Sequence, residues 1–362
     1  MIMTGLRGVG KTVLLNRFAE LAEMAGWESI ELEASKHDET AFRQSIFSKF
    51  RAALLHISPR RRWSERARHA AEVLSSFVLS IDQSGTFSVT WDVDPSEGYG
   101  DHGDLGLDLT DVFLTVGEVA KEKGTGIVLL IDEVQFLTTV QLESLIQAVH
   151  KSVQKKLPIT FVGAGLPQIA ELAGDAKSYA ERLFKFPRID SLTPEEARQA
   201  LVGPAETENV SYDEDAVDLA VSLTHGYPYF IQELGYQAWI VASGNHITAE
   251  DISTAKDAYD AKLDGSFFRV RLDRATPLQT AYMRAMAELG SEPQKAADVA
   301  SLMKRESSQV APIRSQLIDM GLLYTPQHGY AAFTVPDFDK FMMRAVPRLE
   351  VPEIQHRRRR KK

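Results

Sequence analysis

The chain has 362 residues, of which 44% are hydrophobic and 25% charged, and it contains no cysteine. Such a length provides for two or three domains with substantial cores. The lack of cysteine excludes disulfides and thiolate metal sites and is typical of proteins of the reducing cytoplasm, so we expect a cytoplasmic protein. The net charge of −9 excludes a general polyanion binder. No apolar run approaches the length of a membrane span, so we expect no membrane partner.

The first candidate site is the stretch Gly5–Thr12, which follows the pattern G-x-x-x-x-G-K-[ST] of a phosphate-binding loop. Glycines allow such a loop to wrap closely, so that its backbone N–H groups point at phosphate oxygens. Lys11 is expected to reach the β- and γ-phosphates, and the hydroxyl of Thr12 to ligate Mg²⁺. The expected nucleotide-binding residues are Gly5, Arg7, Gly8, Val9, Gly10, Lys11, Thr12 and Val13.

The context of this loop supports a phosphate site. Met1–Met3 is a short apolar strand, and Thr12–Ala25 has the periodicity of a helix, whose positive dipole end would lie beneath the anion. The alternative is a Gly-rich helix start without a ligand. A phosphate-binding loop normally follows a full buried strand, so one expectation is a truncated start; the other is that the short strand suffices.

The segments that follow predict a parallel α/β sheet, because Trp27–Glu33 alternates like a strand and Ala41–Ile57 is helical. We interpret residues 58 to 106 as an insertion on this core. Its five arginines between Arg60 and Arg68 are typical of a solvated face.

Two short β-like runs inside this insertion, Phe77–Ile81 and Thr86–Val93, predict a hairpin. An acidic, Gly-rich stretch, Asp94–Asp108, comes next. It lacks the regular spacing of a calcium-binding loop, which favours a linker.

The second candidate site ends the apolar run Gly126–Ile131, which is typical of a strand buried on both faces. Asp132 and Glu133 follow at its carboxyl end, where open α/β sheets bind ligands. Asp132 is expected to hold Mg²⁺ through water. Glu133 is expected to orient and deprotonate the attacking water. The alternative is a solvated strand end.

With the strand Trp27–Glu33 between the phosphate loop and the Asp-Glu strand, and with Glu133 directly after Asp132, the chain resembles the additional-strand, catalytic-glutamate class of P-loop ATPases. Within that class it is similar to AAA+ and STAND-type ATPases, especially those related to origin-recognition initiators. The resemblance covers nearly all of the chain. It implies an α/β fold with a parallel sheet, ATP and Mg²⁺ as cofactors, ATP hydrolysis and a homo-oligomer.

Two further site residues depend on this resemblance. In the family, a polar sensor side chain ends the strand after the Asp-Glu strand; here that strand, Ile159–Gly163, ends in Gly163-Ala164-Gly165, so only backbone groups could serve. An arginine before the last core strand acts across a subunit boundary in the family. Arg182 matches it, with Arg188 as a poorer candidate; the alternative is that Arg182 pairs with a local acid, Glu181 or Glu171.

The remaining chain predicts three further parts: a helical lid over 193–265, a winged helix-turn-helix over 276–350 and a basic tail over 351–362, after a core over 1–192. In the lid, His225–Phe230 resembles the Gly-x-Pro motif of STAND-type ATPases, which closes over the nucleotide. His225 or Tyr227 could replace the arginine that initiator-type relatives use. The alternative is a helix start whose aromatic residues pack in the lid core.

The expected winged helix consists of helices at 276–289, 295–303 and 307–320 and a two-stranded wing at 321–324 and 330–335. Its third helix would enter the major groove of duplex DNA. The expected contacts come from Ser308, Gln309, Arg314 and Gln316, with Lys304 and Arg305 on nearby phosphates.

The charge of this part supports DNA binding only weakly, because six basic residues oppose five acidic ones between 294 and 345. Two functions therefore remain open. One is a nucleotide-driven switch that acts on duplex DNA through 276–362. The other is a STAND-type signalling or regulatory switch whose winged helix binds protein.

Overall fold

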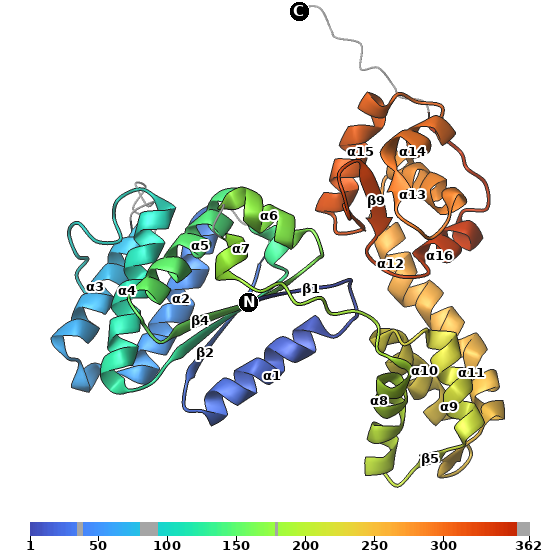
Figure 1. Cartoon of the computed structure of the whole chain (residues 1–362), viewed down its shortest axis with the longest axis horizontal. Coiled ribbons are helices and arrows are strands. Elements are labelled where there is room, and N and C mark those ends of the chain that lie inside the picture. The colour runs from blue at the N-terminus through green and yellow to red at the C-terminus, as the bar shows by residue number, and fades with distance from the viewer. Residues whose placement is uncertain (35–38, 80–92, 178–179, 353–362) are drawn as a thin grey trace, which may run out of the picture. The chain divides into compact units, whose positions relative to one another are not determined.

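The computed structural model describes residues 1–34, 39–79, 93–177 and 180–352. The chain forms two compact units (Figure 1). The N-terminal unit consists of Met1–Gly5 and Gly10–Ile189, and the C-terminal unit of Leu6–Val9 and Asp190–Lys362. Within the described ranges, no helix combines the length and the apolar character that crossing a membrane requires.

A parallel four-stranded sheet is the centre of the N-terminal unit, as predicted, with the strand order β1-β4-β3-β2. The strands are β1 (Ile2–Thr4), β2 (Glu28–Glu33), β3 (Ile127–Asp132) and β4 (Ile159–Gly165). β4 thus lies between the strand of the phosphate loop and the Asp-Glu strand, whereas β2 is at the edge. The segment 185–189 runs along the outer side of β1, since Ile2 N donates to the carbonyl of Lys185 at 2.9 Å and Ile189 N to that of Thr4 at 2.7 Å.

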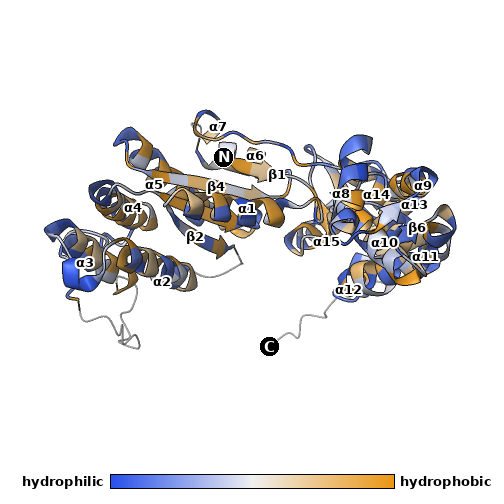
Figure 2. Cartoon of the chain, turned by 90° about the horizontal axis from the view of Figure 1, so that it is seen from below, coloured by the Kyte–Doolittle hydropathy of each residue, from blue (hydrophilic) through white to orange (hydrophobic). Residues whose placement is uncertain are grey.

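The alternation of side chains along β3 divides the core into two layers. Ile127, Leu129 and Ile131 belong to one buried cluster, and Val128 and Leu130 belong to another on the opposite face. Because both faces are covered, the strand is a continuous apolar run, and the neighbouring β4 is also largely hydrophobic (Figure 2).

The helices of the N-terminal unit are α1 (Lys11–Met24), α2 (Glu39–Ile57), η1 (Arg60–Arg62), α3 (Glu65–Leu79), α4 (Leu105–Lys123), η2 (Val134–Phe136), α5 (Thr139–Gln154), α6 (Ile169–Ala176) and α7 (Ala180–Leu183). α3 corrects the predicted hairpin, because Phe77–Leu79 end this helix. Its apolar residues recur at helical spacing and pack against α2 and α4. The second predicted run lies outside the described residues, apart from Val93.

A buried ion pair joins α2 to α4. Nη1 of Arg43 lies 2.8 Å from a carboxylate oxygen of Asp108, and their side chains are 1% and 0% exposed. Arg43 also donates to the carbonyl of Phe77 and to the carboxylate of Glu39. This charged contact lies within the apolar cluster of the helices, so it contributes to the fold of the unit.

The first half of the C-terminal unit is helical: α8 (Pro194–Thr207), β5 (Ser211–Tyr212), α9 (Glu214–Thr224), α10 (Pro228–Val241), β6 (His246–Ile247), α11 (Ala249–Lys262), η3 (Leu263–Phe268) and α12 (Arg269–Leu272). α8 has Thr193 as its N-cap and Pro194 in its first turn. Residues 265–275, which lie between the predicted lid and the predicted winged helix, are largely helical.

The second half contains α13 (Pro277–Leu289), β7 (Gln294–Lys295), α14 (Ala296–Leu302), α15 (Ser307–Asp319), β8 (Leu323–Tyr324), β9 (Tyr330–Phe333) and α16 (Phe338–Ala345). Its sheet has the order β7-β9-β8, so a third short strand joins the two that were predicted. α15 begins at Ser307, as predicted, and Glu306 precedes it as the N-cap and forms a reciprocal capping box with Gln309.

Candidate functional site

The phosphate-loop lysine is buried although it carries a charge. β1 leads directly to the loop, in which Gly8 and Gly10 have φ angles of +89° and +90°. This left-handed conformation favours glycine. The Lys11 side chain is 8% exposed, and its Nζ donates to the carbonyl of Gly5 at 3.0 Å. The ammonium group therefore lies inside the curve of the loop.

The middle of the loop, Leu6–Val9, belongs to the C-terminal unit. The hydroxyl of Tyr227 donates to the carbonyl of Arg7, and the backbone N–H of Tyr229 donates to the carbonyl of Gly8 at 3.2 Å. Burial raises the pKa of Tyr227, which keeps the phenol protonated as a donor. Tyr227 thus contacts the backbone of the loop, and Pro228 opens α10 as the Gly-x-Pro resemblance predicts.

Arg7 is also held by residues near the end of the chain. Its backbone N–H donates to the carbonyl of Thr334 at 3.1 Å. A Cβ atom on Gly321 would come 2.5 Å from Nη2 of Arg7, so the guanidinium lies against that glycine. Arg7 and Lys11 are both predicted to bind the nucleotide, but they belong to different units. Arg7 packs within the C-terminal unit, whereas Lys11 belongs to the N-terminal unit.

The two predicted magnesium ligands lie side by side although 120 residues separate them in the sequence. The hydroxyl of Thr12 donates to Oδ2 of Asp132 at 2.5 Å. Within the described residues, no group of three or more His, Cys, Asp or Glu side chains could hold a metal ion. A hydroxyl and one carboxylate fit Mg²⁺, which keeps several waters and takes its other ligands from substrate phosphates.

Glu133 follows Asp132 in a left-handed conformation, with φ 53° and ψ 39°. This conformation is unusual for a residue with a Cβ and is concentrated at functional sites. The backbone N–H of Glu133 donates to Oδ1 of Asp132 at 2.7 Å. The amide of Gln135 donates to the carboxylate of Glu133. The sequence analysis missed Gln135; an amide two residues after the acidic pair was the available signal.

The tip of β4 carries no side chain that could act as a sensor. A Cβ atom on Gly165 would come 2.8 Å from Oε1 of Gln135, and one on Gly163 would come 2.9 Å from Val134. Oε1 of Gln135 instead accepts the backbone N–H of Leu166 at 3.0 Å. The space next to the strand tip is therefore filled from η2.

Arg182 lies in the last turn of α7 and is exposed. The side chains of Glu171 and Glu181, its predicted local partners, are not among those that the structure describes. Arg188, the poorer candidate, lies in the segment beside β1 and forms a parallel bridge with Thr4. Both arginines are exposed, and of the two only Arg182 lies in a helix.

Two family models match the sequence. Residues 1–171 match the model described as AAA domain, and residues 265–342 match a Domain of unknown function (DUF8462). The comparison with curated proteins gives no match. The first match covers the phosphate loop, the Asp-Glu strand and β4.

Among solved structures, the chain is similar to the Walker-type ATPase PABY2304 of Pyrococcus abyssi, with a TM-score of 0.57 and 16% identity over 94% of this chain and 90% of that chain. Weaker likenesses extend to Cdc6p of Pyrobaculum aerophilum (TM-score 0.43, 15% identity, 96% and 88% covered) and to the RuvB Holliday junction branch migration motor of Thermotoga maritima (TM-score 0.44, 13% identity, 97% and 87% covered). At such identities the first likeness concerns the fold alone, and the other two carry no argument. Residues 1–171 therefore match an AAA domain, and this match includes both candidate motifs.

Proposed function

We propose that this protein binds ATP with Mg²⁺ at the loop Gly5–Val13, hydrolyses it and acts as a nucleotide-driven switch. The observation that carries the proposal is the 2.5 Å hydrogen bond between Thr12 and Asp132. It joins the two motifs that the sequence analysis selected separately, at the carboxyl end of a parallel sheet, where such folds bind ligands.

Each residue has a distinct task in this proposal. The loop amides and Lys11 bind the phosphates, and Lys11 stabilises the charge that develops on the transferred phosphoryl group. Thr12 and Asp132 would hold Mg²⁺, which would neutralise charge on the phosphates. Glu133 orients the attacking water and takes its proton as the bond from oxygen to the γ-phosphorus forms and the bond to the leaving ADP breaks.

An ATPase assay tests this function. The full chain should release phosphate from ATP with Mg²⁺, and EDTA should stop the release. A chain that binds ATP stoichiometrically but turns over slowly would support the switch rather than a fast motor. No ATP binding in the presence of Mg²⁺ would contradict the proposal.

The exposed Arg182 supports a homo-oligomer in which this side chain reaches the nucleotide of a neighbouring subunit. Such an arginine supplies positive charge to the transition state. Activity per subunit should then rise with protein concentration. A mixture of the inactive variants Arg182→Ala and Glu133→Gln should recover hydrolysis, because one mixed interface combines an intact Glu133 with an intact Arg182. Full activity of Arg182→Ala alone would contradict this role.

The part over 276–350 is proposed to be a winged helix that binds duplex DNA, with α15 as the helix in the major groove and the basic tail on phosphates. Three helices and a small antiparallel sheet support this interpretation. Ser308, Gln309, Gln316 and Lys304 are exposed, and Arg314 is half-buried. Gln309 and Gln316 already accept hydrogen bonds from Glu306 and Gln279, so few groups remain for bases.

A protein partner is the second candidate, and the side chains of α15 favour it. The exposed face of this helix is mostly uncharged, which suits a protein contact better than a phosphate backbone. A gel-shift titration of the full chain with duplex DNA at low salt separates the two candidates. A shift that disappears as salt rises supports DNA, and no shift supports the protein partner.

A further inference from the structure

Gln135 connects the proposed catalytic base to the tip of β4. One end of its side-chain amide lies at the carboxylate of Glu133, and the other lies 3.0 Å from the backbone nitrogen of Leu166. A backbone N–H can only donate, so the amide oxygen must face Leu166 and the NH₂ group must face Glu133. The hydrogen-bond network therefore determines the orientation of this amide, with its donor on the acid.

The backbone around Glu133 shows why its carboxylate needs such support. Its left-handed conformation has a steric cost and persists only where neighbouring contacts hold it. Its N–H is bound by Asp132, and its carbonyl accepts the N–H of Phe136 at 2.9 Å. These bonds hold the backbone, whereas Gln135 holds the carboxylate itself.

Gly165 leaves room at the tip of β4 for the side-chain amide of Gln135, which lies in η2. A side chain at this strand tip would meet Oε1 of Gln135 at 2.8 Å, so the amide could keep its present place only because position 165 is a glycine. We propose that Gln135 is the positioning residue of the site: it holds the carboxylate of Glu133 toward the attacking water and takes the place of the sensor side chain that β4 lacks. This inference rests on the proposed ATPase function.

Two substitutions separate positioning from packing. Gln135→Met keeps the volume and loses both hydrogen bonds, whereas Gln135→Glu keeps an acceptor for Leu166 but replaces the donor with a second negative charge beside Glu133. Both variants should lower kcat at least tenfold and leave KM for ATP within about twofold, because the contact acts only on the attacking water. Gln154→Met, an exposed residue of α5, is the matched control and should behave like the wild type.

The Glu133→Gln background supplies the decisive comparison. Since Gln135 acts through Glu133, adding Gln135→Met to Glu133→Gln should lower kcat no further. The inference would be overturned if both single variants had the wild-type kcat. It would also be overturned if Gln135→Met lowered kcat by the same factor in the wild type and in Glu133→Gln. A wild-type chain that hydrolyses no ATP would instead overturn the proposed function, which keeps the two failures distinct.

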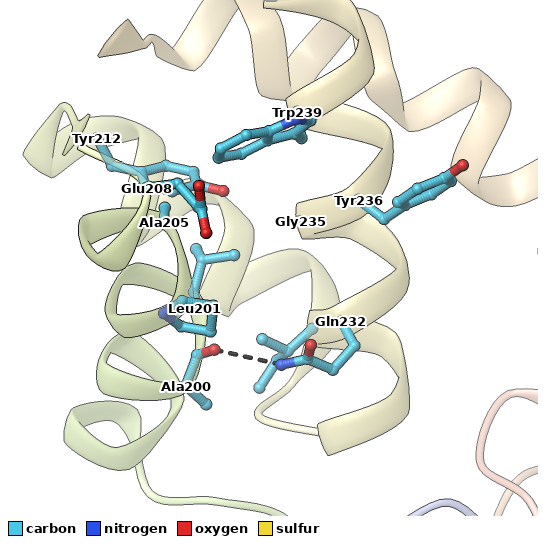
Figure 3. A pocket seen from close by; sticks show the side chains of 11 residues that line it. Ala200, Leu201, Ala205, Glu208, Tyr212, Gln232, Gly235, Tyr236 and Trp239 are labelled. Atoms are coloured by element: carbon cyan, nitrogen blue, oxygen red, sulfur yellow. Dashed lines mark hydrogen bonds between the residues drawn. The ribbon is translucent and has the colours of Figure 1, made fainter. Parts of the chain in front are cut away.

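A groove in the C-terminal unit is independent of the nucleotide site. It lies between α8 and α10, ends at Tyr212 of β5 and has a volume of about 360 Å³. Figure 3 shows Leu201 and the ring of Trp239 on its walls, with Glu208 next to Tyr212. Small residues, including Gly235, leave the space between the helices open.

Helix α10 carries apolar residues on its exposed face as well as on its buried face. Phe230, Ile231, Leu234 and Ala238 are buried, yet Tyr236, Trp239 and Ile240 are 61%, 43% and 58% exposed. A helix that is hydrophobic all round is normally covered on every side. The second face of α10 therefore suits a partner with apolar side chains.

The acidic residues around the groove determine which charge the partner must carry. Residues 193–265 contain fourteen acidic and three basic side chains. Glu206 and Glu208 lie at the carboxyl end of α8, where the helix dipole is also negative. Trp239 adds an aromatic face that attracts cations. The groove therefore selects a positively charged segment and repels nucleic acid.

We infer that the groove between α8 and α10 docks a basic segment of a partner protein, with an apolar side chain against Leu201 and Trp239 and an arginine at Glu208. The start of the chain's own basic tail is bound elsewhere, because the carbonyl of Pro352 accepts a hydrogen bond from Arg305.

A labelled synthetic peptide tests this docking on the full chain. Its sequence is that of residues 351–362, which combines Val351 and Ile354 with six basic residues against one acidic residue. The peptide should bind at low salt, and Trp239→Leu or Glu208→Gln should raise its Kd at least fivefold. Glu195→Gln, which removes the same charge from the exposed start of α8, should leave the Kd unchanged. No binding to the wild type, or equal effects of Glu208→Gln and Glu195→Gln, would overturn the docking.

Discussion

The end of β3 and helix α15 are both candidate sites, but their side chains differ in the hydrogen bonds that they form. At β3, Thr12, Asp132, Glu133 and Gln135 form a continuous chain of hydrogen bonds across three segments. On α15, by contrast, the described hydrogen bonds of the predicted contact residues serve the local fold, as the capping box of Gln309 does.

The two regions differ in how closely the sequence determines the function. A phosphate site requires certain residue types at fixed spacing, so the motif and the geometry agree at β3. A small helical domain can be built from many sequences and can bind DNA or protein, so the fold of 276–350 leaves its partner open. Substitutions in the two regions should therefore have effects of very different size.

Glu133→Gln should have the largest effect. Removal of the proposed base should lower ATP turnover about 10²–10⁴-fold while ATP and Mg²⁺ still bind. Single-turnover phosphate release and equilibrium binding measure the two quantities. If the variant hydrolysed ATP at the wild-type rate, Glu133 would not be the base, and the alternative of a solvated strand end would hold.

Asp108→Asn should have the next largest effect, and it acts on stability. It removes the buried carboxylate that pairs with Arg43 and leaves only the exposed Glu39 as an ionic partner, so the free energy of unfolding should fall by about 2 kcal/mol. The matched control is Glu20→Gln in the ion pair with Arg17, whose side chains are 61% and 59% exposed. That change should cost under about 1 kcal/mol.

Urea denaturation measures both variants, and nucleotide binding measured below the transition separates stability from function. Folded Asp108→Asn should still bind ATP, because the ion pair lies between α2 and α4 rather than at the loop. Equal unfolding midpoints for the two variants would show that the buried pair does not stabilise the unit more than the exposed one.

Arg314→Ala should have the smallest effect. If α15 contacts DNA, the loss of one half-buried arginine should weaken duplex binding by about 1 kcal/mol, which is a five- to tenfold change in Kd. Lys262→Ala, an exposed cation of α11, is the control. An unchanged gel shift for Arg314→Ala, with a salt dependence that is also unchanged, would favour a contact elsewhere on the chain.

The sequence predicted the parts of the fold that depend on periodicity and on motif spacing. The parallel sheet, the helix after the phosphate loop and the proximity of Thr12 to Asp132 follow from the run Gly126–Ile131 and from the loop pattern. The helix α3 was mistaken for a strand at Phe77, because a short apolar run has no clear period until its partners are known.

Tertiary contacts account for what the sequence could not indicate. The conformation of Glu133, the bridge made by Gln135 and the association of Leu6–Val9 with the C-terminal unit depend on segments far apart in the chain. The Arg43–Asp108 pair is of the same kind, since neither residue stands out among the charged residues of the sequence. The motifs therefore predicted the residues of the proposed site, and the structure adds Gln135, which binds both Glu133 and the backbone of Leu166.

Calorimetric titration of Mg²⁺-ATP into the wild type, Lys11→Ala and the exposed control Lys121→Ala tests the central claim most directly. Lys11 is buried within the loop, so its removal takes away the cation on the β- and γ-phosphates. The account predicts one ATP per chain in the wild type and the control, and an affinity at least about a hundredfold lower in Lys11→Ala, which corresponds to about 3 kcal/mol. Equal affinity in the wild type and Lys11→Ala would contradict the assignment of Gly5–Thr12 as the nucleotide site.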